Sequence, residues 1–190
     1  MNNVGQNVPE HLDKVLGVQE NQTTHSFEDN DFWILEYENT PFDKVKSYIS
    51  VGLGRHLLKQ PSGKNIRQEL MFTILKKFEH VSIEKSLASL SLDFIDRHIP
   101  IPDNQVIPWQ GGVFEDYEYS AVYCTSARHM PEEFEIINGN PLLVFVWLIP
   151  IFPEEREYIQ IFGWESFEEL IDEQQPNFFD LDRPRIDVKI

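Results

Sequence analysis

The sequence has one cysteine, few basic residues and no long apolar run. Cys124 has no partner for an intramolecular disulfide, which is typical of proteins in a reducing compartment. The longest apolar run, residues 142–152, is shorter than the roughly 20 residues of a membrane-spanning helix. Residues 1–14 have neither the basic leader nor the apolar core of a secretory signal. These absences predict a cytoplasmic protein that does not cross a membrane.

Basic residues are outnumbered: 16 Lys and Arg stand against 32 Asp and Glu, which gives a net charge of −16. Residues 41–100 are net basic, so the acidic excess lies at the N-terminus and in the second half of the chain. An acidic surface repels phosphate backbones, which argues against nucleic acid as a direct partner. It favours basic protein partners, because complementary charge speeds encounter. The alternative is that the charge only keeps the protein soluble.

Complete catalytic, nucleotide-binding and metal-binding motifs are missing as well. The pair Gly52 and Gly54 lacks the third glycine of a dinucleotide-binding loop, and the six histidines do not fall at metal-ligand spacing. We therefore expect no cofactor and no metal. A nucleophile–base pair of Cys124 and His129 is conceivable, but a free cysteine in an apolar strand more often serves as a small buried hydrophobe. The sequence thus predicts a protein that is not an enzyme.

Carboxylates are the one catalytic residue type in abundance. Glycoside hydrolysis needs two of them at a defined separation across a cleft. The clusters Glu115, Asp116 and Glu118, or Glu132 and Glu133, could supply such a pair, whereas the alternative is a solvated acidic loop. An unrecognised hydrolase therefore stays the least favoured hypothesis.

The strongest architectural signal is the stretch from Leu142 to Glu173. Its apolar half predicts a buried strand, and its acidic half predicts two helices separated by Gly163. Ser166 and Glu169 have the spacing of a capping box, and Phe167, Leu170 and Ile171 fall on one helix face.

Other elements follow from the same periodicities. In the first half of the chain we expect a helix from Pro9 to Gly17, a loop over 18–31, and an antiparallel meander of strands at 32–37, 48–53 and 67–75. A helix over 83–98 follows; Ser82 caps it and the prolines of 99–102 end it. After that we expect an irregular or hairpin-like connection over 103–119, a strand at 121–125 and a final strand at 186–190.

Two tryptophans, Trp109 and Trp164, lie beside polar residues and glycines rather than inside apolar runs. An aromatic ring next to carboxylates is a common ingredient of a protein-binding surface, although both rings could equally cover the edge of the core. The candidate partner-binding residues are Trp109, Glu115, Asp116, Glu118, Glu154, Glu155, Trp164, Glu165 and Glu168.

Three blocks, in order and spacing, resemble the Suppressor of fused domain family, especially its small bacterial members. They are Tyr48–Gly54, Arg67–Leu75, and Trp147–Glu157 followed by Gly163 and Phe167–Ile171. Gly54 stands where the family often has serine. The resemblance implies an α+β fold with a mixed, largely antiparallel sheet flanked by helices. It also implies one domain over 1–190, with a core at about 30–175, a helix and loop appendage at 1–29 and a C-terminal extension at 176–190.

The resemblance further implies action by binding protein rather than by catalysis. Similar bacterial proteins resemble immunity proteins of polymorphic toxin systems, which neutralise a toxin by occluding it. The acidic balance of this chain suits a basic toxin domain. The alternative is a regulatory scaffold that holds another cellular protein or peptide, for example by adding a strand to a sheet edge.

Overall fold

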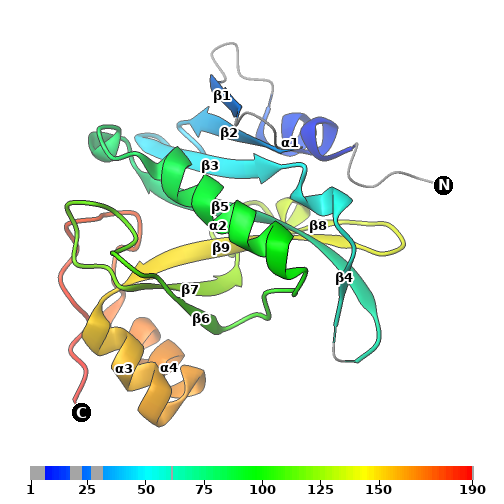
Figure 1. Ribbon diagram of the computed structural model, residues 1–190. Coiled ribbons are helices and arrows are strands. Elements are labelled where there is room, and N and C mark those ends of the chain that lie inside the picture. The colour runs from blue at the N-terminus through cyan, green and yellow to red at the C-terminus, as the bar shows by residue number, and fades with distance from the viewer. Residues whose placement is uncertain (1–6, 18–22, 27–31, 61, 190) are drawn as a thin grey trace.

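The computed structural model describes residues 7–17, 23–26, 32–60 and 62–189. Within these ranges, nine strands form one sheet against which four α-helices lie (Figure 1). The strands are β1 (Thr23–Ser26), β2 (Trp33–Glu38), β3 (Val45–Val51), β4 (Leu58–Lys59), β5 (Asn65–Leu75), β6 (Gln105–Pro108), β7 (Ala121–Ser126), β8 (Ile136–Ile137) and β9 (Leu143–Ile151). The helices are α1 (Val8–Leu16), α2 (Ile83–Arg97), α3 (Pro153–Phe162) and α4 (Trp164–Gln174). This arrangement confirms the predicted α+β class.

The sheet has the order β1-β2-β3-β5-β9-β7-β6, with β4 paired to β5 and β8 paired to β9. Strands β2, β3 and β5 form the predicted antiparallel meander, in which Ile49 lies opposite both Leu35 and Met71. Strands β5 and β9 run parallel, with Met71 opposite Trp147. Strand β9 is antiparallel to β7, its neighbour on the other side. The apolar run over 142–152 therefore supplies the strand that joins the two halves of the sheet.

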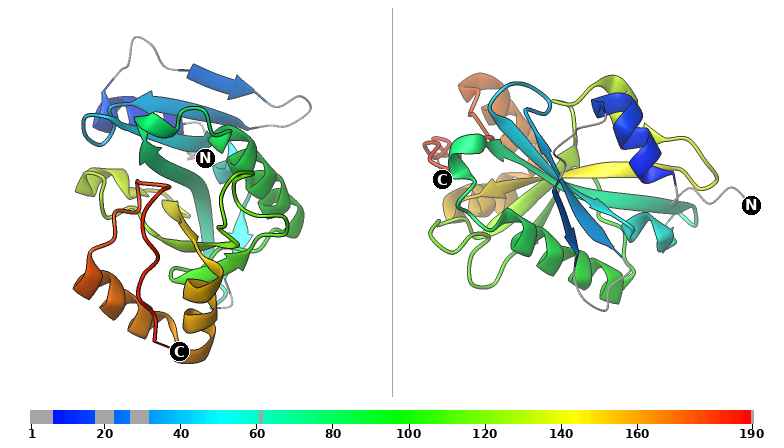
Figure 2. Two further views of the ribbon diagram at one scale, coloured as in Figure 1. Left: turned by 90° about the vertical axis from the view of Figure 1, so that its left-hand side faces the viewer. Right: turned by 90° about the horizontal axis from the view of Figure 1, so that it is seen from above.

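Strand β9 is apolar on both faces because both faces of the sheet are covered. Leu148 packs with Phe94 of α2 in one core cluster. Trp147, which points the other way, belongs to a second cluster with Leu12 of α1 and Phe167 of α4. Figure 2 shows α1 and α2 on opposite faces of the sheet.

Helix α2 matches its prediction to within one residue. Its N-cap is Ser82 as expected, but the serine side chain makes no capping hydrogen bond. His98 ends the helix in the left-handed conformation, with φ of 52°. Pro100 and Pro102 follow at once, so the chain cannot continue the helical ladder.

Three local predictions are wrong. Residues 23–26 of the predicted loop form β1, while 18–22 and 27–31 lie outside the described residues. The final strand does not form, since residues 186–189 are irregular. Ser166 caps no helix, because α4 begins two residues earlier, at Trp164 after Gly163.

The lengths of the four helices, 9 to 15 residues, bear on whether any of them could cross a membrane. None of those within the described residues has the length and apolar character needed to cross a membrane.

Candidate functional site

The block Tyr48–Gly54 is held in place by one buried carboxylate. Glu69 on β5 is fully buried and accepts a hydrogen bond of 2.6 Å from the Ser50 hydroxyl. Its other oxygen accepts the backbone N–H groups of Gly52 and Gly54, each at 2.9 Å. Burial nevertheless raises the pKa of Glu69 to about 7, despite these donors. Two of the family-like blocks therefore meet at this carboxylate.

The same contact explains the glycine at position 54. A Cβ atom there would lie 2.3 Å from Leu143 Cδ1 and 3.1 Å from Glu69 Oε1. Leu143 is fully buried at the start of β9. In this chain, Leu143 thus occupies the space that a serine side chain would need.

The α2 face of the sheet carries an open, mainly apolar groove of about 430 Å³. Five separate parts of the chain contribute to it. The lining residues are Gln60, Ser62, Ile66, Gln68, Pro100, Ile101, Pro102, Asp103, Thr125, Ser126, Glu135, Ile136, Val144, Phe145 and Val146. The groove lies where β5 and β9 begin, beyond the end of α2 that Pro100 and Pro102 terminate.

One buried side chain fixes the wall of the groove to its floor. The Gln68 amide nitrogen donates to the Ile101 carbonyl at 2.7 Å, and the Ile101 N–H donates to the Gln68 amide oxygen at 2.9 Å. Gln68 is only 3% exposed, so this pair of hydrogen bonds is shielded from water. These hydrogen bonds therefore hold the Ile101 segment of the groove against β5.

The charged groups of the groove are all acidic. Asp103 is exposed and Glu135 is half-buried at its rim, and the lining that the described residues form contains no lysine, arginine or histidine. Ile136 adds an apolar side chain that is 45% exposed. An apolar groove with an acidic rim suits an apolar side chain flanked by basic residues.

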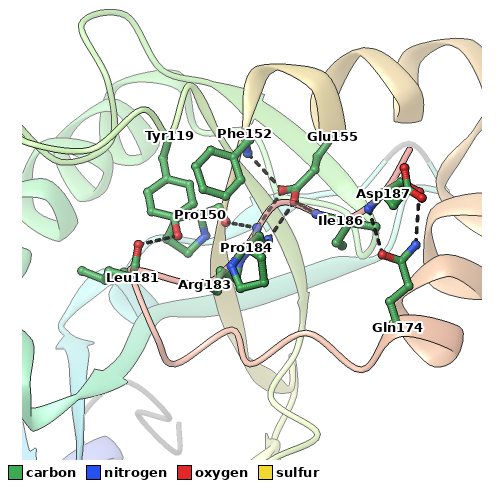
Figure 3. Close-up of polar contacts among 10 residues, drawn as sticks. All are labelled: Tyr119, Pro150, Phe152, Glu155, Gln174, Leu181, Arg183, Pro184, Ile186 and Asp187. Carbon is green, nitrogen blue, oxygen red and sulfur yellow. Dashed lines mark hydrogen bonds and ion pairs between the residues drawn. The ribbon is translucent and has the colours of Figure 1, made fainter. Parts of the chain in front are cut away.

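A second buried cluster ties the C-terminal segment to α3. Arg183 donates to both carboxylate oxygens of Glu155 at 2.7 and 2.6 Å and to the Pro150 carbonyl at 3.2 Å (Figure 3). Glu155 also accepts the N–H groups of Phe152 and Ile186. The predicted candidate Glu155 is thus fully buried, and the structure gives it an internal role instead of a place at the surface.

The other candidates from the loop over 109–118 are partly engaged. Trp109 is half-buried against the α2-side core. Glu115 and Asp116 are exposed. Arg185 pairs with both Glu118 and Glu154, and this brings the loop next to the start of α3.

The candidates on α4 are exposed or half-buried. Trp164 is 40% exposed and Glu165 is exposed. Glu168 accepts the Tyr123 hydroxyl at 2.7 Å and pairs with Arg128 at 3.2 Å. Of the nine predicted residues, Glu155 is therefore buried, whereas Glu118, Glu154 and Glu168 are already paired with arginines.

The conceivable nucleophile–base pair does not assemble. Cys124 is fully buried in the α2-side core, and burial raises the pKa of its thiol. His129 lies on the opposite face of the sheet, against Trp147 at a ring-centroid distance of 4.1 Å. Burial lowers the pKa of His129 to about 4. Cys124 thus behaves as the buried hydrophobe that the sequence favoured.

Sequence reasoning missed the groove, because its lining comes from segments that are distant in the chain. Two signals in the sequence could have indicated it. The prolines of the Ile99–Pro102 segment end α2, so the helix does not cover the sheet beyond that point. Val144 and Val146 alternate along β9 and therefore face the same side of the sheet, where they line the groove.

The structure is thus an α+β domain with an apolar groove that carries Asp103 and Glu135. The sequence matches the Suppressor of fused protein (SUFU) family over residues 28–184, and the chain belongs to that family. This confirms the resemblance that the three sequence blocks indicated. No match to the chain was found among curated proteins.

Solved structures share the fold. A SUFU homolog from Neisseria gonorrhoeae FA 1090 has a TM-score of 0.77 at 19% identity, with 98% of each chain covered. A Sufu–Fu complex has a TM-score of 0.67 at 12% identity, covering 96% of this chain and 91% of that chain. Drosophila Suppressor of fused has a TM-score of 0.65 at 15% identity, and the match covers 92% of this chain but 49% of the Drosophila chain.

Proposed function

We propose that this chain is a non-enzymatic, cytoplasmic protein-binding domain that neutralises a basic toxin by occluding it. The observation that carries the proposal is the apolar groove with Asp103 and Glu135 at its rim. The net charge of −16 and the family membership support it.

The groove fits one kind of occupant. An apolar side chain of the partner would lie against Ile66, Val144 and Val146, where burial of apolar area favours binding. Lysine or arginine residues on either side of it would meet the rim carboxylates. Such a contact stabilises the complex and steers a basic protein toward the groove.

Co-expression with the product of a neighbouring toxin-like gene tests the proposal. The wild-type chain should form a complex and restore growth. The double variant Asp103→Lys with Glu135→Lys should lose both, whereas Asp43→Lys with Glu10→Lys changes two exposed acids outside the lining of the groove and should keep both. Absence of a complex and of growth rescue with the wild-type chain would sink the toxin-binding role.

The alternative is a regulatory scaffold that sequesters another cellular protein or peptide. The likeness to the Sufu–Fu complex favours it, since that structure contains a bound protein partner. Gene order separates the two, because an immunity gene should lie beside its toxin. A scaffold should instead bind the product of a regulatory neighbour, with no effect on toxin-arrested growth.

A further inference from the structure

Three large apolar side chains are exposed together where α3 meets α4. Ile161 is 54% exposed, Phe162 47% and Trp164 40%. We call these three residues the α3–α4 corner. Single exposed apolar residues are ordinary on protein surfaces, but a contiguous group marks an interaction site more often. Tryptophan and phenylalanine are also the residue types that supply much of the binding energy at protein interfaces.

The corner is held rigidly. The rings of Tyr158 and Phe162 lie against each other in a tilted arrangement, with centroids 4.7 Å apart and one helical turn between the two residues. Gly163, with φ of 87°, makes the bend, and its N–H donates to the Ile159 carbonyl at 2.9 Å. Ile159 and Phe167 face the core and are buried. The corner therefore points outward from a packed base, which lowers the entropy lost on binding.

The two helices that form the corner are rich in carboxylates. Helices α3 and α4 carry eight acidic residues and one arginine. Three of the acids make ion pairs with arginines of the same chain: Glu155 with Arg183, Glu154 with Arg185, and Glu168 with Arg128. The other five are exposed and make no ion pair with the residues that the structure describes; they are Glu157, Glu165, Glu169, Asp172 and Glu173.

We infer that the α3–α4 corner is a docking surface for a basic face of a partner protein. The apolar side chains would enter an apolar depression on that face, and its lysine and arginine residues would pair with the surrounding carboxylates. A second copy of this chain is a poor occupant, because two such corners would bring like charges together.

This inference rests on the proposed protein-binding function but uses a different surface. The groove lies at the start of β9, whereas α3 follows the end of β9 (Figure 1). A partner that reached both surfaces would be held at two points, and loss of one contact would weaken the complex without abolishing it.

A labelled synthetic peptide of leucine and lysine at helical spacing is a suitable probe, with fluorescence anisotropy at physiological ionic strength as the measurement. The full chain should bind it, and so should the double variant Asp103→Lys with Glu135→Lys, which changes the groove and leaves the corner intact. Phe162→Ser with Trp164→Ser should weaken binding about tenfold or more, although every carboxylate remains. Leu92→Ser with Ile99→Ser, which removes two exposed apolar side chains elsewhere, should leave the dissociation constant unchanged. A peptide with glutamate in place of lysine should not bind.

Equal affinity of the corner variant and the wild-type chain would overturn the inference. So would a wild-type dimer in sedimentation that the corner variant dissociates, because the occupant would then be a second copy. Repeating growth rescue with the corner variant separates the two proposals. If the wild-type chain rescues growth and the corner variant does so equally well, the corner is not used while the toxin-binding role stands. If the wild-type chain fails to rescue, the toxin-binding role is wrong, and the peptide result alone decides the corner.

Discussion

The guanidinium group of Arg183 makes a bidentate ion pair with Glu155, in which the two side chains are 2% and 0% exposed. Arg183 comes 28 residues after its partner and fixes the irregular C-terminal segment beside the first turn of α3. The pair therefore ties this segment to α3, one of the two helices that form the α3–α4 corner.

Removing this arginine should be costly. Arg183→Met leaves an unpaired buried carboxylate, and we expect a loss of about 3–5 kcal/mol in the free energy of unfolding. The double variant Glu155→Gln with Arg183→Met should be more stable than Arg183→Met alone, because it removes the unpaired charge. Urea unfolding measures both. Arg185→Ala breaks half-exposed pairs and should stay within about 1 kcal/mol of the wild-type protein. Equal losses for Arg183 and Arg185 variants would contradict the assignment.

A side chain at position 54 should collide with Leu143. Gly54→Ala places its Cβ in the space that Leu143 Cδ1 fills, and overpacking of this kind costs about 1–3 kcal/mol. Leu143→Ala should cost less in the Gly54→Ala background than in the wild-type protein, since it opens that space. A double-mutant cycle by denaturant unfolding reports the coupling, and strictly additive losses would show that the two positions do not compete.

Glu69 should make stability fall as the pH rises. Its pKa in the folded protein, about 7, lies above the ordinary value of 4.5. Below pH 4.5 the carboxyl is protonated in both states, and between 4.5 and 7 only the unfolded state ionises, which favours unfolding. Relative to Glu69→Gln, the wild-type protein should therefore lose about 3 kcal/mol between pH 4 and 8. Parallel pH profiles of the two proteins would refute this.

His129 should have the opposite pH dependence. Its pKa in the folded protein is about 4, below the ordinary 6.5, so its contribution to stability is present above pH 6.5 and is lost as the pH falls toward 4. The variant His129→Phe keeps an aromatic ring against Trp147 but does not titrate. The wild-type protein should lose up to about 3 kcal/mol relative to it between pH 7 and 4. Thermal unfolding over this range measures the difference, and a constant difference between the two proteins would rule the effect out.

Local periodicity predicted the parts of the fold that local sequence controls. The apolar run over 142–152 predicted β9, and alternating apolar residues predicted β3 and β5. Apolar residues at helical spacing, followed by Pro100, predicted where α2 begins and ends. The short strands β4 and β8 have two residues each, too few to show a pattern, and they exist because longer strands offer them a partner.

The wrong predictions have tertiary causes. Ile186 looked like the start of a strand, but its N–H donates to Glu155 instead of to a neighbouring strand. Glu155 looked like a surface acid, because nothing nearby in the sequence reveals that Arg183 reaches it. The groove was missed for the same reason, because the five segments that line it meet only in the folded chain.

The parallel pairing of β5 with β9 has a consequence for the synthesis of the chain. Strand β9 lies between β5 and β7, and both are translated before it. Until residue 151 leaves the ribosome, the meander and the β6–β7 hairpin have no strand to connect them, and each presents an unpaired edge to other chains. The stage of synthesis between the emergence of residue 126 and that of residue 151 is therefore the one at which both edges are open to pairing with other chains.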